Sequence, residues 1–79
     1  MRMRGGNYAA ALPLLERAVE RLRETRSLTE AYAEFNLANT RYHLGKCDGV
    51  IALLETSQRI QGSGVAIDNL RRDAQRTCR

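Results

Sequence analysis

The stretch from Asn36 to Leu54, NLANTRYHLGKCDGVIALL, decides the fold. It has the pattern of the end of one amphipathic helix, a tight turn at Gly45-Lys46, and the start of a second helix that packs back on the first. Glycine readily takes the left-handed backbone conformation that ends a helix, which places the turn. No residue set in this stretch resembles catalytic machinery, so it predicts a small helical interaction module and not an enzyme.

Composition and charge fit one small soluble helical domain. The chain has 79 residues, of which 43% are hydrophobic and 28% charged, and its net charge is +4. Most basic residues are spread along the sequence, and this spread disfavours a nucleic-acid surface. One mild cluster consists of Arg71, Arg72, Arg76 and Arg79. No apolar run approaches the roughly 18 residues of a membrane span. Met1 to Gly6 is basic but no apolar core follows it, so we expect no signal peptide.

Helical periodicity begins near the start of the chain. Met1 to Gly6 is typical of the last turn of a preceding helix. The first full helix is expected from about Tyr8 to Glu24, with Pro13 near its first turn, where a missing N–H costs little. Its apolar stripe consists of Tyr8, Ala11, Leu12, Leu15, Ala18, Val19 and Leu22.

Three more helices are predicted. Ser27 to Glu30 has the form of a capping box, and the helix that follows ends at Gly45. That helix carries two apolar stripes, one with Ala33, Leu37, Thr40 and Leu44 and the other with Ala31, Phe35, Ala38 and Tyr42, so we expect it to pack on two neighbours. The third helix is expected to begin at Cys47, with Asp48 favouring its N-terminus, and to stop before a turn at residues 61–64. The fourth carries Ile67, Leu70, Ala74 and Cys78 on one stripe. The sequence therefore predicts an all-α fold of four sequential antiparallel helices.

An internal repeat is also present. Residues 6–18 align without gaps on residues 45–57, with glycine at the turn in both copies. Together with Asn36-Leu37-Ala38, this pattern resembles a tetratricopeptide repeat, a helix-turn-helix unit that stacks into a right-handed superhelix. The family's signature positions fall on Leu37, Ala38, Gly45, Val50, Leu54 and Ser57. The sequence departs from the family pattern at the early aromatic position, which is Glu34 here. The resemblance implies the end of one repeat at residues 1–24, a full repeat at 27–62 and a capping helix at 65–78.

Such repeats bind peptides in a concave groove lined by their first helices. The resemblance places the groove on Tyr32, Phe35, Asn36, Asn39, Tyr42, His43, Arg72 and Arg76. Asparagine amides can both donate to and accept from a peptide backbone. Phe35 and Tyr42 suit a core position as well as a groove. We do not predict the family's carboxylate clamp, because only Asn36 matches that pattern.

The sequence thus predicts a bacterial, non-catalytic scaffold that binds a protein or peptide partner. One alternative is a regulatory or sensing segment of a larger bacterial signalling protein, such as a kinase or transcriptional regulator. A less favoured alternative is a basic helical module that binds nucleic acid. The first helix lacks most of the partner helix expected before it, so an exposed apolar face and a homodimer through that face are also expected.

The remaining reactive residues predict no catalytic site, cofactor or metal site. His43 is the only histidine and has no serine or cysteine and carboxylate at a suitable spacing. The two cysteines lack the spacing of zinc ligands. Cys47 and Cys78 are equally distant from the predicted turn between the last two helices, which brings them to the same height and makes them candidates for a disulfide. Two buried free thiols are the alternative. The protein is expected in the cytoplasm by default and outside it if the disulfide forms.

Overall fold

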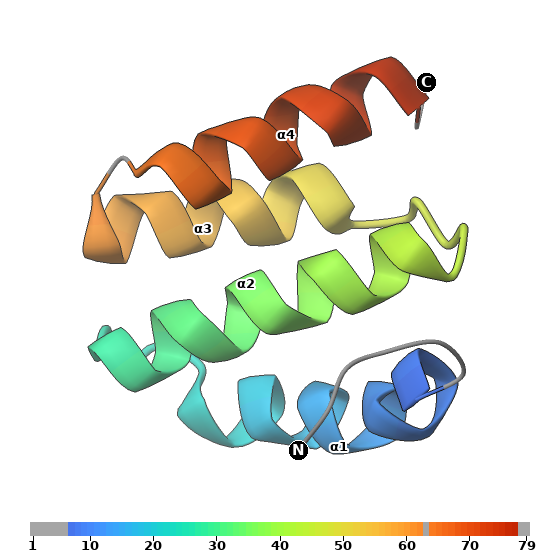
Figure 1. Cartoon of the computed structure of the whole chain (residues 1–79). Coiled ribbons are helices and arrows are strands. Elements are labelled where there is room, and N and C mark those ends of the chain that lie inside the picture. Colours follow the sequence, from blue (N-terminus) through green and yellow to red (C-terminus); the bar gives the residue numbers. More distant parts are fainter. Residues whose placement is uncertain (1–6, 63, 78–79) are drawn as a thin grey trace.

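The computed structural model describes residues 7–62 and 64–77, and within these ranges it contains four helices and no strand. The helices are α1 (Asn7–Leu22), α2 (Leu28–His43), α3 (Val50–Gln61) and α4 (Val65–Thr77). Figure 1 shows them in chain order, each joined to the next by a short connection, so that consecutive helices run in opposite directions. The predicted all-α class is confirmed.

Helix α2 packs on both α1 and α3, as its two apolar stripes predict. On one side, Ala33 and Leu37 form a buried cluster with Val19 of α1. The larger cluster joins α2 to α3 and α4 and consists of Ala38, Val50, Leu54, Ile67, Leu70 and Ala74. Among the described side chains, Leu53 alone packs against both clusters. Burial of the apolar stripes is the main force that holds helices of this length together.

Both ends of α2 are capped by local hydrogen bonds. At its start, the Ser27 hydroxyl accepts from the backbone N–H of Glu30 at 3.1 Å, which is one half of the predicted capping box. At its end, Gly45 takes a φ of +75°. The Gly45 N–H donates to the carbonyl of Tyr42 at 3.1 Å and the Lys46 N–H donates to that of Arg41 at 2.8 Å. This pair of bonds is a Schellman motif, which explains why the chain turns here.

Three predicted details of the helices are wrong, two of them in α1 and one in α3. The first helix ends at Leu22 and not Glu24, because Glu24 has a φ of 67° and cannot continue a right-handed helix. Pro13 lies inside α1, beyond its first turn. The carbonyl that Pro13 leaves without a helical partner belongs to the exposed Ala9, where water can hydrate it.

The third helix also begins later than expected, at Val50 and not Cys47. Gly49 precedes it with a φ of 77°, a conformation that a helix does not accommodate. Asp48 therefore lies in the α2–α3 connection, outside the first turn of α3.

Some predictions concern residues outside the described ranges. These are the helical turn at Met1 to Gly6, Ser63 of the α3–α4 turn, and Cys78. Within the ranges that are described, no helix combines the length and the apolar character needed to cross a membrane.

Candidate functional site

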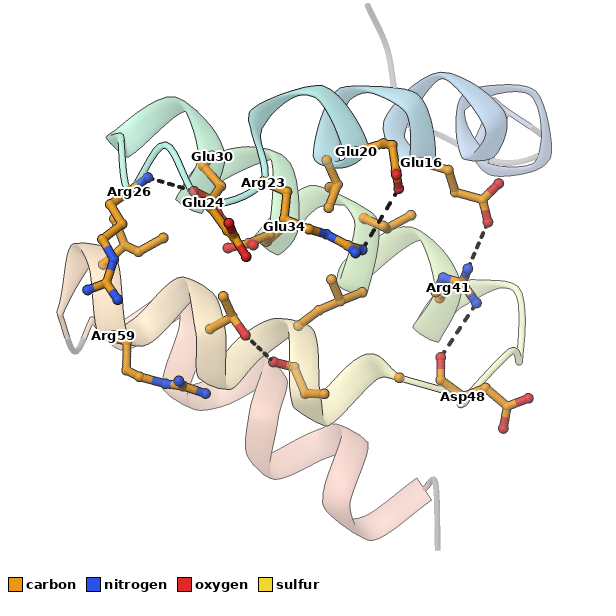
Figure 2. Close-up of a pocket in the computed structure, with 17 residues that line it drawn as sticks. Glu16, Glu20, Arg23, Glu24, Arg26, Glu30, Glu34, Arg41, Asp48 and Arg59 are labelled. Atoms are coloured by element: carbon orange, nitrogen blue, oxygen red, sulfur yellow. Dashed lines mark hydrogen bonds and ion pairs between the residues drawn. The ribbon is translucent and has the colours of Figure 1, made fainter.

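A cleft of about 1000 Å³ lies between α1 and α3, with α2 behind it. Helices α1 and α3 both pack on α2, but no Cα atom of one comes within 8 Å of the other. The side chains of Val19, Leu37 and Leu53 give the cleft an apolar part. Figure 2 shows charged side chains projecting into it from all three helices and from the α1–α2 connection. The cleft thus offers an apolar surface surrounded by charge.

The charges around the cleft differ from those of the chain as a whole. The acidic residues that line it are Glu16, Glu20, Glu24, Glu30, Glu34 and Asp48, and the basic ones are Arg23, Arg26, Arg41 and Arg59. Six of the chain's nine acidic residues are therefore gathered here, against four of its thirteen basic ones. The formal charge of the lining is −2 in a chain of net charge +4. A cationic ligand is favoured at this surface.

At one end of the cleft, Glu30 stabilises the α1–α2 connection. Its carboxylate accepts a hydrogen bond from the backbone N–H of Arg26 at 2.8 Å and one from the Thr25 hydroxyl at 3.4 Å. The connection needs this support because Glu24 and Arg26 both have positive φ angles, which are strained for residues other than glycine. Burial alone would raise the pKa of Glu30, but the hydrogen bonds to its carboxylate lower that pKa below the ordinary value.

Glu34 lies one helical turn further along α2 and has a different environment. It is only 3% exposed, and its Oε1 has no hydrogen-bond partner among the described residues. Burial, a hydrogen bond with Glu30 and the charge of Glu30 raise the pKa of Glu34, Arg23 and Arg59 act in the opposite direction, and the net result is a pKa of about 7. Near neutral pH, Glu34 is thus a mixture of carboxylic acid and carboxylate.

An arginine closes the other end of the cleft. Arg41 forms an ion pair with Glu16 of α1 at 2.7 Å and approaches the backbone carbonyl of Asp48 at 3.5 Å. It therefore links α1 to the α2–α3 connection across the surface of α2 (Figure 2). The guanidinium is committed to these acceptors, whereas the Glu34 end of the cleft remains open to a ligand.

The groove residues implied by the family resemblance lie elsewhere. At 3.6 residues per turn, those on α2 occupy the face opposite Glu34 and Leu37. Tyr32, Asn36 and His43 are exposed, and Asn39 is partly buried. Phe35 and Tyr42 are partly buried against the larger core cluster. None of the eight predicted residues lines the cleft.

Some of the predicted groove residues do meet. His43 stacks on the ring of Tyr8, with centroids 4.6 Å apart, and Tyr42 meets the His43 ring edge-on at 5.4 Å. On α4, Arg72 is exposed, and Arg76 pairs with Asp73 at 3.3 Å. A groove that joins the α2 residues to these arginines stays a prediction.

The cleft was missed by the sequence reasoning, although one signal pointed to it. Glu30 and Glu34 are four residues apart on a helix, directly beside the stripe that contains Ala33 and Leu37. Glu34 stands at the border of an apolar stripe, at the position that corresponds to an aromatic residue in the repeat family that the sequence resembles. A carboxyl group there indicates either a buried polar group or a cleft that no bulky side chain fills. The structure contains both.

Comparison with known proteins adds no relative to this picture: no protein-family model, curated protein or solved structure matches the chain.

Proposed function

We propose that this chain is a non-catalytic interaction module that binds a peptide or a helix of a partner protein, and that the cleft between α1 and α3 is its binding surface. The observation that carries the proposal is the cleft itself, which is open, partly apolar and lined by ten charged side chains. Apolar contact gives affinity to such a surface and charged groups select the partner.

The shape of the cleft favours an elongated partner. Two helices that flank a third, with no Cα atom of one within 8 Å of the other, leave a trough parallel to their axes. An amphipathic helix or an extended segment can lie in such a trough, which is a common mode of peptide recognition. The volume of about 1000 Å³ is at the upper limit of small-molecule sites, and this also favours a peptide over a metabolite.

We propose further that the chain is built from tetratricopeptide-like helical hairpins. The support comes from the residues at the family's signature positions. Leu37, Ala38, Val50, Leu54 and Ser57 are all buried, as helix-packing positions require. Gly45 has the left-handed conformation that ends a first helix. In that arrangement, the predicted groove on the opposite face of α2 is a second candidate surface for the same kind of partner.

A peptide selection tests the function and separates the two surfaces. A phage-displayed library of short random peptides is panned on the purified chain, and enriched peptides are measured by fluorescence polarisation. The variant Ala52→Arg adds a long side chain to an exposed position that lines the cleft. We expect it to weaken binding about tenfold or more, equal to about 1.4 kcal/mol. The control Ala66→Arg makes the same change at an exposed position of α4 outside the cleft and should bind normally.

A third variant, Asn36→Arg, blocks the predicted groove instead. If it abolishes binding while Ala52→Arg does not, the module binds through the predicted groove and the assignment to the cleft is wrong. If no peptide is enriched above the level on an unrelated protein, the proposed function itself fails.

A further inference from the structure

Glu34 combines two properties that are seldom found together in a structural residue. Its side chain is almost completely buried, yet its Oε1 has no hydrogen-bond partner among the described residues. Buried carboxyl oxygens are normally paired, because an unpaired one loses its hydration without compensation. Since Glu34 also lines the cleft, the missing donor can come from a bound partner (Figure 2).

The charged groups around Glu34 do not supply that donor. Arg23, directly after α1, is paired with Glu20 at 3.9 Å, and neither Arg23 nor the exposed Arg59 of α3 forms an ion pair with Glu34 in the described part of the chain. On α2, one oxygen of the neighbouring Glu30 is held by the backbone N–H of Arg26. The free acceptor therefore belongs to Glu34.

We propose that Glu34 anchors the bound partner through one basic side chain, whose ammonium or guanidinium N–H donates to Oε1 of Glu34 inside the cleft. This inference rests on the proposed function and specifies the chemistry of the partner. A cation fits better than a neutral donor, because the lining carries six carboxyl groups and four guanidiniums. With Glu30 beside it, the cation lies between two carboxylates, and its hydrogen bonds to them are charge-assisted.

Binding of a cation at Glu34 is coupled to a proton. The carboxylic acid form of Glu34 has to lose its proton to the solvent before a positive charge can take its place, whereas the carboxylate binds directly. The groups that set this balance are Glu30 on α2, Arg23 in the α1–α2 connection and Arg59 on α3. Since the pKa of Glu34 is about 7, binding should be about tenfold tighter near pH 8 than near pH 6.

Small cations that have the shape of an arginine or lysine side chain test the proposed contact with Glu34 even though the partner protein is unknown. The probes are n-butylguanidinium and n-butylammonium, with n-butylurea as a neutral control of the same length. Each is titrated into isotopically labelled protein near pH 6 and near pH 8 and followed by NMR. We expect both cations to shift the signals of residues that line the cleft, with about tenfold tighter binding at the higher pH. The relative affinities show whether the site prefers arginine or lysine. The urea should bind far more weakly.

Two further measurements place the cation at Glu34. The carboxyl carbon of Glu34 should titrate at a lower pH when n-butylguanidinium is present, which reports contact without any mutation. The variant Glu34→Gln should lose at least nine-tenths of the affinity near pH 8, whereas Glu55→Gln, which removes a carboxylate paired with Arg71 outside the cleft, should bind normally.

The inference is overturned if the urea binds as tightly as the cations, if affinity does not change with pH, or if the titration of Glu34 is unaffected by the probe. Should Glu34→Gln fail to fold, the carboxyl titration of the unmodified protein still decides. If selected peptides bind in the cleft but need no basic residue for binding, the inference about Glu34 is wrong and the proposed function still stands.

Discussion

The substitution Glu34→Gln tests the unusual environment of this carboxyl group through the stability of the protein. The pKa of Glu34 is raised from 4.5 to about 7 in the folded chain. Between these pH values the folded protein holds a proton that the unfolded chain has lost. The free energy of unfolding therefore falls as the pH rises through this range, and at lower pH the penalty is absent.

The size of the effect follows from the shift. Each pH unit corresponds to about 1.4 kcal/mol, so the full penalty above pH 7 is about 3 kcal/mol. Water in the open cleft screens part of this penalty, and we expect about 2 kcal/mol. A protein of this length has a total stability of roughly 4 to 12 kcal/mol, so the change is easily measured.

Glutamine has the shape of the protonated acid and no charge. We expect Glu34→Gln to match the parent protein near pH 4 and to exceed its stability by about 2 kcal/mol near pH 8. Urea denaturation followed by far-ultraviolet circular dichroism at both pH values measures this. Titrating groups other than its hydrogen-bond partner Glu30 contribute equally to both proteins, so the difference reports the Glu34–Glu30 pair.

The exposed Glu20 provides the matched control. Glu20→Gln makes the same chemical change at the rim of the cleft and should alter stability by less than about 0.5 kcal/mol at either pH. The reasoning is refuted if Glu34→Gln lowers stability near pH 8, or if its effect is the same at both pH values.

Three other predictions concern the stability of the protein, two from the structure and one from the sequence. Ser27→Ala removes the hydroxyl that caps α2 and should lower the unfolding free energy by about 1 kcal/mol in urea denaturation; no loss would mean that the cap is dispensable. Leu54→Ala empties a fully buried position and should cost about 2 to 5 kcal/mol, whereas the same change at Leu14, which is 55% exposed, should cost less than about 0.5 kcal/mol. If Cys47 and Cys78 form the predicted disulfide, the intact mass rises by two hydrogens on reduction and stability falls by up to roughly 3 to 4 kcal/mol; an unchanged mass would remove the bond.

Much of the fold could be predicted from the sequence because helix packing is encoded locally. The two apolar stripes of α2 predicted two neighbours, and Ala33 and Ala38 are indeed buried in different clusters. Ser27 and Gly45 marked the ends of α2 because capping depends only on residues within one turn. The start of α3 was missed, since Asp48 suits a helix N-terminus but the conformation of Gly49 forces a later start.

The candidate site could not be predicted in the same way. Whether Glu34 is exposed or buried depends on how far apart α1 and α3 lie, and residues distant in the sequence determine that separation. The pattern around Glu34 shows a charged residue next to an apolar stripe, which is the usual border of an amphipathic helix. Burial, the unpaired oxygen and the raised pKa appear only after the three helices are assembled.

The position of Leu53 has a consequence for how the molecule unfolds. In an array of helical hairpins, each unit contacts only its neighbours, and weak contacts between units let the ends melt separately. Leu53 packs against both core clusters, so α3 cannot detach from the α1–α2 pair without also disturbing the cluster that holds α4. The four helices should therefore unfold in a single cooperative transition. Because Ala38 of α2 also belongs to the larger cluster, we expect the α2–α3 interface and Leu53 together to make the two hairpins one thermodynamic unit.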